Sequence, residues 1–173
     1  GVAGAGRVHA ERGEPGRRLW GLVGVAALGV YGCCRDRLLG LLWPEVSQVR
    51  ARHSLGQMLY AIRMSLDKDV FTGVDPIRLN ADSLGSDIGD FTDALALGDL
   101  EAAVERYGGR FLDGFYLSGA PEFERWLDAQ RARVERSYTD ALERLAKRAE
   151  GANDPAAAAR WRADRVIRRA FRS

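Results

Sequence analysis

One segment carries side chains suited to contact with nucleic-acid bases. Between residues 47 and 66 apolar residues recur at helical spacing, so a helix that buries them turns a second set of residues outward. That outward face carries Arg50, His53, Gln57 and Tyr60, followed by Met64. An arginine can donate two hydrogen bonds to guanine, and a glutamine amide can pair with the adenine edge. We therefore take Arg50, His53, Gln57 and Tyr60 as candidate base-reading residues, although Tyr60 could instead pack as core.

A second set of residues lies at the flanks of this face, where phosphate is the more accessible group. The set consists of Arg52, Ser54, Arg63 and Arg78. Guanidinium and hydroxyl groups both bind phosphate oxygens, which orients a protein on a duplex without selecting a sequence. Taken alone, the outward arginines are more typical of a helix that simply faces water. The chain-wide pattern has to decide between the two interpretations.

Three helices and a hairpin are expected to position these side chains. The sequence predicts, in order, an apolar helix within residues 19–34, a helix over 35–43, a helix over 47–66, and strands at 70–71 and 77–79 around a turn at 73–76. Pro44 ends the second helix, and Ser47 can cap the third. The buried stripe of the third helix is Leu55, Leu59, Ile62 and Leu66. Three helices followed by a hairpin is the order of a winged helix.

The remaining chain has the pattern of paired helices. Helices are expected from 86 or 87 to 97, over 99–107, from 121 to about 150 and from about 154, with a loop at 108–120. Small residues at 102–103 and 156–159 favour tetratricopeptide-like stacking. The aromatic residues expected in its core are Phe91, Tyr107, Phe111, Phe115, Phe123, Trp126, Tyr138 and Trp161. The predicted fold class is mainly α, with an irregular segment at 1–16, a winged-helix domain at 17–82 and a helical domain at 83–173.

Longer strings resemble a known family. Residues 35–45 (RDRLLGLLWPE), 51–55 (ARHSL) and 59–63 (LYAIR) resemble the DNA-binding part of the antibiotic regulatory activators, the SARP-type proteins. Residues 98–107, 111–115 and 122–126 are similar to the bacterial transcriptional activator domain that follows it in that family. The resemblance covers about 17–161. It implies a winged helix of the response-regulator type, a tetratricopeptide-like domain, and transcriptional activation through double-stranded DNA and RNA polymerase, with self-association on DNA as a further possibility.

The chain departs from that family at both ends. Residues 1–16 are rich in glycine and lack the strand alternation of the small sheet that usually precedes the first helix, so we expect that sheet to be lost and Leu19, Leu22, Val23 and Val30 to be partly uncovered. Residues 162–173 become basic and lose the apolar pattern of a further repeat. These ends suggest a truncated or divergent member. Cys33 and Cys34 replace the serine or threonine expected to cap the second helix, which puts its start in doubt.

Composition argues against an enzyme. The 173 residues carry a net charge of +2, two histidines and two adjacent cysteines, with no phosphate-cradling loop, zinc spacing or nucleophile beside a base. We therefore expect no catalytic residues, no metal and no cofactor. Adjacent cysteines outside a disulfide framework favour a cytoplasmic location. The apolar run 19–34 after Arg17 and Arg18 resembles a signal peptide or membrane anchor, but its four glycines and short length favour a buried helix and no membrane partner.

Two other functions remain open from the sequence. The helical half could be a protein interaction module in a chain that no longer binds DNA, which salt-dependent binding to duplex DNA would distinguish. An adaptor anchored by residues 19–34 would partition with membranes.

Overall fold

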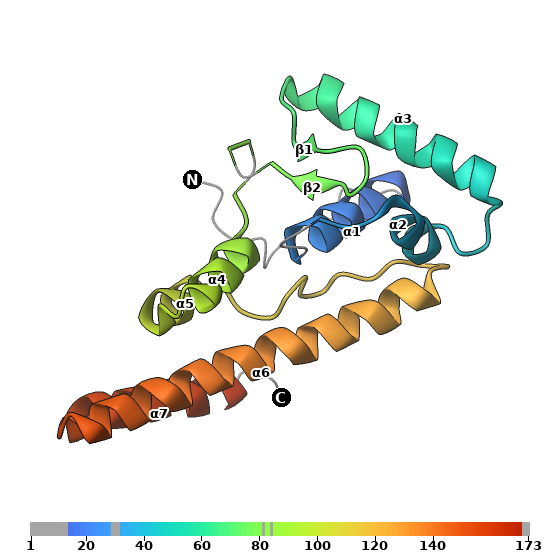
Figure 1. Ribbon diagram of the computed structural model, residues 1–173. Coiled ribbons are helices and arrows are strands. Elements are labelled where there is room, and N and C mark those ends of the chain that lie inside the picture. The colour runs from blue at the N-terminus through green and yellow to red at the C-terminus, as the bar shows by residue number, and fades with distance from the viewer. Residues whose placement is uncertain (1–13, 29–31, 81, 84, 171–173) are drawn as a thin grey trace.

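The computed structural model describes residues 14–28, 32–80, 82–83 and 85–170 (Figure 1). The elements in chain order are α1 (Glu14–Leu28), α2 (Arg35–Leu42), α3 (Gln48–Leu66), β1 (Phe71–Thr72), β2 (Arg78–Leu79), α4 (Asp87–Ala96), α5 (Leu100–Arg106), α6 (Pro121–Gly151) and α7 (Pro155–Ala170). The described chain is mainly helical, which confirms the predicted fold class at that level. The winged-helix and tetratricopeptide-like assignments stay predictions.

Helix α1 begins earlier and ends earlier than the sequence predicted. It starts at Glu14, so the assignment of residues 14–16 to an irregular segment was wrong. Proline in a first turn loses no helical hydrogen bond, which suits Pro15 at the start of this helix. The helix ends at Leu28 and does not continue to Cys34. Residues 1–13, where the lost sheet was expected, and 29–31 lie outside the described residues.

The hairpin gains a third short segment from the chain before α2. Strands β1 and β2 are antiparallel, with Phe71 opposite Leu79 and Thr72 opposite Arg78. Cys33 forms an isolated bridge with Ile77 through two backbone hydrogen bonds of 2.9 Å. Cys33, near the end of the apolar run, is therefore paired with the hairpin and is not part of a helix.

The start of α2 is stabilised by the hairpin. Cys34 occupies the N-cap position without a side-chain hydrogen bond. The backbone N–H of Arg35 instead donates to the Asp75 carboxylate at 3.1 Å, and the Arg35 Nε donates to the carbonyl of Val74 at 2.6 Å. A carboxylate at a helix N-terminus accepts an otherwise unpaired amide and complements the dipole. The sequence put the start of α2 in doubt, and this was wrong. The helix begins at Arg35, and Asp75, forty residues further along the chain, supplies the acceptor that Cys34 lacks.

Helix α3 spans the predicted residues, but its cap differs from the prediction. Ser47 is the N-cap residue, yet its side chain makes no capping hydrogen bond. Of the predicted stripe, Leu55 and Ile62 are buried and Leu59 is half-buried, while the side chain of Leu66 lies outside the described residues. The helix therefore has the predicted inner face.

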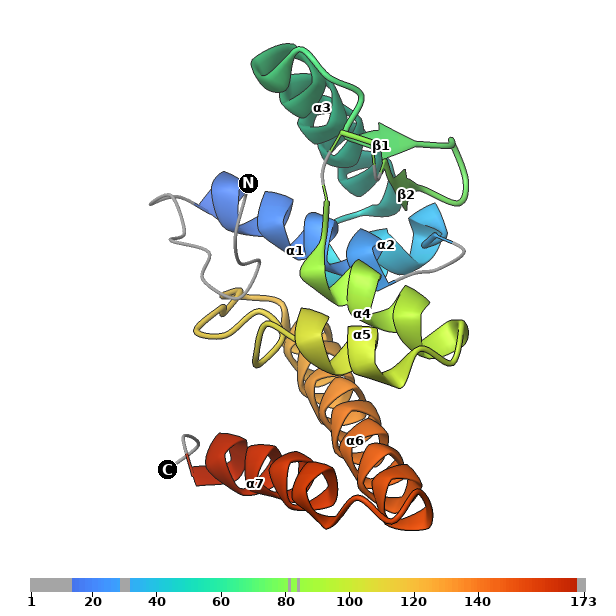
Figure 2. The same ribbon diagram turned by 90° about the vertical axis from the view of Figure 1, so that its left-hand side faces the viewer.

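The last four helices form two pairs, α4 with α5 and α6 with α7 (Figures 1 and 2). Local residues set the starts of α4, α5 and α6, and those at Ser86 and Pro121 were predicted. The Ser86 hydroxyl accepts from the N–H of Gly89 at 3.2 Å, the Asp99 carboxylate accepts from the N–H of Ala102 at 3.1 Å, and Pro121 occupies the first turn of α6. Helix α6 contacts α2, α5 and α7 along its length, so it connects the two ends of the molecule.

Both halves of the chain contribute to one hydrophobic core. Leu22, Leu38 and Leu42 from the first half belong to the same buried cluster as Phe123 and Leu127 from α6. The predicted aromatic core is also confirmed: Phe91, Phe111, Phe115, Phe123, Tyr138 and Trp161 are buried, and Tyr107 and Trp126 are partly buried against them. Three of these rings form a chain, since Tyr107 contacts both Phe91 and Tyr138, the latter in a stack 4.1 Å between centroids.

The expectation that α1 is partly uncovered was wrong for Leu22. Leu22 is 0% exposed and Val23 is half-buried, whereas the side chain of Leu19 and all of Val30 lie outside the described residues. Two glycines allow the close packing that covers this helix. A Cβ at Gly21 would lie 3.3 Å from the Phe123 ring, and one at Gly24 would lie 2.6 Å from the Leu112 side chain. The cover of α1 therefore comes partly from the helical half of the chain, in addition to α2 and β2.

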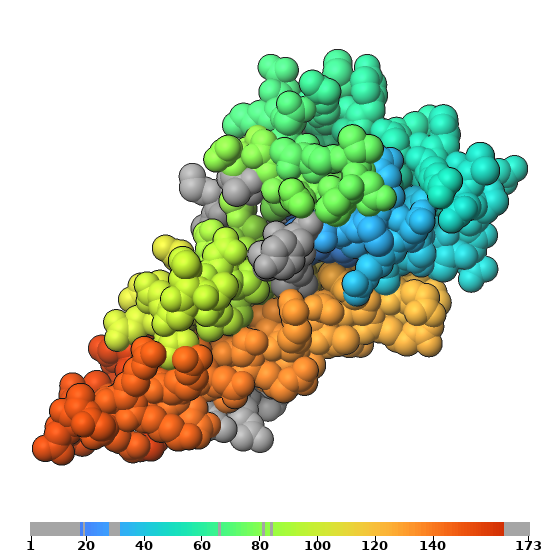
Figure 3. All heavy atoms as spheres, viewed as in Figure 1, coloured from blue at the N-terminus to red at the C-terminus, as the bar shows by residue number. Residues whose placement is uncertain are grey.

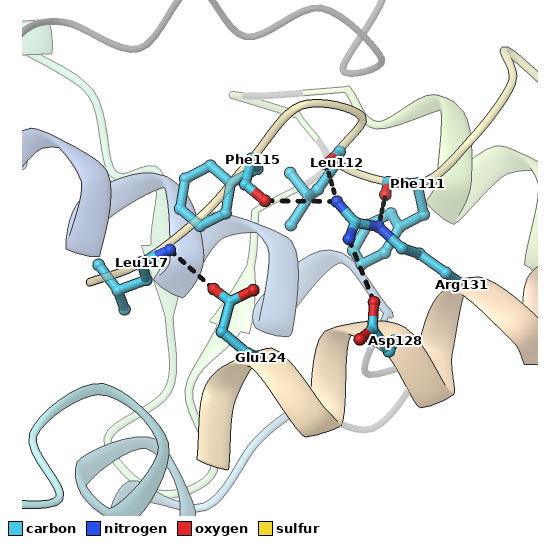
Figure 4. Close-up of polar contacts among 7 residues, drawn as sticks. All are labelled: Phe111, Leu112, Phe115, Leu117, Glu124, Asp128 and Arg131. Carbon is cyan, nitrogen blue, oxygen red and sulfur yellow. Dashed lines mark hydrogen bonds and ion pairs between the residues drawn. The ribbon is translucent and has the colours of Figure 1, made fainter. Parts of the chain in front are cut away.

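The segment between α5 and α6 is held by polar contacts from α6 (Figure 4). The guanidinium of Arg131 donates to the backbone carbonyls of Phe111, Leu112 and Phe115, and the Glu124 carboxylate accepts from the N–H of Leu117 at 2.7 Å. Within the segment the Leu112 carbonyl also accepts from the N–H of Phe115 at 3.0 Å, and the contacts from α6 pair further backbone groups there. They also fix the buried side chains that pack against α1.

Candidate nucleic-acid interface

Helix α3 lies along one edge of the molecule, beside the hairpin and away from α6 and α7 (Figures 1 and 3). Its inner face is formed by Ala51, Leu55 and Ile62, which are buried. Its opposite face is accessible over several turns. A helix needs this kind of placement to enter the major groove, which admits one α-helix.

The predicted base-reading residues all lie on this accessible face. Arg50, His53, Gln57 and Tyr60 are exposed, and Tyr60 is 66% exposed, so it is a surface residue and not part of the core. Arg50, His53 and Gln57 make no side-chain hydrogen bond or ion pair with another described residue. Their donors and acceptors are therefore available to a ligand within the part of the chain that the structure describes.

The predicted phosphate-contacting residues are more scattered. Arg52 forms an ion pair with Asp36 of α2 at 3.2 Å, and Arg63 forms one with Asp69 at 3.0 Å. The side chains of both ion pairs are more than half exposed. Such surface pairs contribute only about 0–1 kcal/mol, so exchange of either aspartate for a phosphate costs little. Ser54 is half-buried, at the shoulder of the face. Arg78 is exposed and lies on β2, in the hairpin, as the sequence predicted.

The charge of this region changes sharply at the end of α3. The helix contains three arginines and no acidic residue. The following segment 67–86 contains four aspartates against one lysine and one arginine, a net charge of −2. Attraction to a polyanion is therefore concentrated on α3, and the hairpin region adds local repulsion. Sequence reasoning treated the hairpin as a phosphate-binding flank and did not weigh this.

The structure also adds a residue that the sequence reasoning passed over. Val49 is 78% exposed and lies on the same side of α3 as His53 and Tyr60. Helical spacing alone could have found it, because four and seven residues separate these positions and about 3.6 residues make one turn. Met64 is 64% exposed one turn beyond Tyr60, as the predicted face required.

Two titratable groups elsewhere have shifted pKa values, and each shift has a structural cause. Burial raises the pKa of the Cys33 thiol, and the neighbouring Cys34 adds to this. Burial also raises the pKa of Asp87, opposed by the hydrogen bond that its carboxylate accepts from the N–H of Ile88 at 2.8 Å. Asp87 borders a cavity of about 10 Å³ beside Tyr107 and Gly108, which is room for about one water molecule. Neither group forms a ligand site.

A membrane-spanning helix and a metal-ligand cluster are both absent from the residues that the structure describes. No helix there is long and apolar enough to span a bilayer, and α1 has 15 residues. No cluster of three or more potential metal ligands occurs in the same ranges.

Comparison with known proteins finds no matching family model, no similar curated protein and no similar solved structure. The resemblance to the antibiotic regulatory activators therefore stays a prediction from the sequence strings alone.

Proposed function

We propose that this chain is a sequence-specific DNA-binding transcriptional activator of the cytoplasm that places α3 in the major groove of double-stranded DNA. The observation that carries the proposal is the outward face of α3, where Arg50, His53, Gln57 and Tyr60 are exposed together on a helix without acidic residues. Hydrogen-bonding side chains of these types match the base edges of the major groove. Arg50 and Gln57 would distinguish bases, and Arg52 and Arg63 would bind phosphate.

The fold suits this role because α3 is supported from behind. Ala51 and Leu55 belong to the core that α2 and the hairpin share with α6, and Met58 and Leu59 pack against it. A rigid support matters, since a recognition helix must keep its side chains in register with the base pairs. The proposal extends by resemblance to RNA polymerase as the protein partner and to self-association on DNA.

One observation favours the alternative function, a protein interaction module. Leu97, at the turn between α4 and α5, is 85% exposed, and Asp93 and Asp99 nearby are also exposed. An exposed leucine among carboxylates fits a partner with a basic rim around an apolar contact. In an activator this surface would be the contact for the transcription machinery, so the alternative differs only in lacking DNA binding.

The experiment that tests the proposal measures binding of the full chain to a labelled pool of random-sequence duplexes by fluorescence anisotropy at low salt. We expect binding, and after selection of the preferred sequence we expect Arg50→Ala to lower the preference over the starting pool. An arginine on α6, Arg133, is exposed and distant in the chain from α3, so Arg133→Ala is the matched control and should leave the preference unchanged. A folded chain that binds no duplex at low salt would refute the proposal.

A further inference from the structure

We propose that α3 selects A·T base pairs by apolar contact with the methyl group of thymine, and that Val49 makes this contact. The inference rests on the proposed function and names the base pairs that the site prefers. Its starting point is the position of Val49 in the first turn of α3 with a side chain 78% exposed. In recognition helices the N-terminal residues are the ones that contact base edges.

Exposure of one valine is common on protein surfaces and indicates nothing by itself. The position of Val49 among its neighbours is what matters. Val49, His53 and Tyr60 follow one another at intervals of four and seven residues, so they share one side of the helix. The surface that the proposal places against the bases thus begins with an apolar side chain, Val49, and continues with hydrogen-bonding ones.

The chemistry of the groove determines what such a surface selects. Thymine presents a C5 methyl group in the major groove, and the other unmodified bases present no methyl group there. Gln57 is exposed on the same face, about 12 Å along the helix from Val49, and can accept from and donate to adenine. Arg50, directly after Val49, suits guanine. The face therefore predicts a site that combines A·T pairs with a neighbouring guanine.

Charge favours DNA over a protein as the occupant of this face. Helix α3 has three arginines and no acidic residue, whereas the hairpin region beside it is acidic. A polyanion is attracted most strongly to the start of α3, where Arg50 and Arg52 lie beside Val49. The apolar side chains then meet the only apolar groups that the base edges offer.

The test replaces thymine by deoxyuridine, which removes the methyl group and keeps the base pairing. The duplex selected from the random pool is resynthesised with deoxyuridine at one thymine at a time, and affinities for the full chain are compared. At one or more positions we expect affinity to fall about fourfold, which corresponds to about 0.8 kcal/mol for one buried methyl group. In the Val49→Ala variant this difference should disappear at one of those positions.

The control is an equally exposed valine outside α3. Val74, in the hairpin turn, is 76% exposed, so Val74→Ala makes the same chemical change and should retain the full thymine preference. Salt-dependent binding without any effect of deoxyuridine would overturn the inference while leaving the proposed function intact. So would a Val49→Ala variant that keeps the wild-type difference at every position. Absence of all duplex binding would instead refute the proposed function.

Discussion

Replacement of Arg131 should destabilise the whole chain, because this side chain holds the segment that joins the helical half to α1. Its side chain is 12% exposed, and its guanidinium donates to the carbonyls of Phe111, Leu112 and Phe115. A hydrogen bond from a charged group contributes about 1.5–3 kcal/mol to stability. The three bonds share one guanidinium and are not additive, so we expect Arg131→Ala to lower the free energy of unfolding by about 2–4 kcal/mol.

Urea denaturation followed by tryptophan fluorescence measures this loss. Trp126, one of four tryptophans, contacts the Phe111 ring at 6.3 Å between centroids, so part of the emission reports on this segment. At about 2–4 °C per kcal/mol, the thermal midpoint should fall by roughly 5–15 °C. Arg131→Lys keeps the charge but loses the planar fork, so it should give an intermediate loss.

Arg125→Ala is the matched control for Arg131→Ala. Arg125 is also on α6 and forms an ion pair with Glu122 three residues earlier, but its side chain is 70% exposed. Exposed helical pairs of this kind contribute about 0.5 kcal/mol or less. Equal small losses in the Arg125 and Arg131 variants would show that the three carbonyls are satisfied by water and that the reasoning is wrong.

Three further predictions concern groups outside α3. In the native chain a thiol reagent should modify Cys34 quickly and Cys33 slowly, because Cys33 is buried and its raised pKa keeps it protonated; equal rates would contradict this. The raised pKa of Asp87 contributes stability that is complete below its ordinary value of 3.8 and lost as the pH rises through the folded value. Asp87→Asn should therefore gain stability relative to wild type between mildly acid and neutral pH in denaturation curves. A stability difference between variant and wild type that does not change with pH would refute the raised pKa of Asp87. Asp75→Ala should lower stability by about 0.5–2 kcal/mol through the lost cap on Arg35, with Asp75→Asn closer to wild type in thermal melts.

Local residues made much of this fold predictable. The starts of α4 and α6 follow from Ser86 and Pro121, and the outward face of α3 follows from helical periodicity alone. These signals act within one or two turns, so they can be recognised without knowledge of the fold.

Contacts between distant segments were not predictable in the same way. Nothing near α1 in the sequence indicates that Phe123 and Leu112 pack against it. In the sequence its glycines resembled interruptions of a helix, but in the structure Gly21 and Gly24 are sites of close packing. The cap of α2 by Asp75 and the ion pairs of Arg52 and Arg63 also join separate segments. Tertiary contact determined each of these features, and local propensity contributed little.

The salt dependence of duplex binding tests the central claim most directly. The logarithm of the binding constant should fall linearly with the logarithm of salt concentration, with a slope of about −2.7 if Arg52, Arg63 and Arg78 each neutralise one phosphate. Arg63→Ala should make this slope shallower by about one, and Arg133→Ala on α6 should leave it unchanged. Binding that does not depend on salt, or that weakens equally in both variants, would contradict the placement of α3 on DNA.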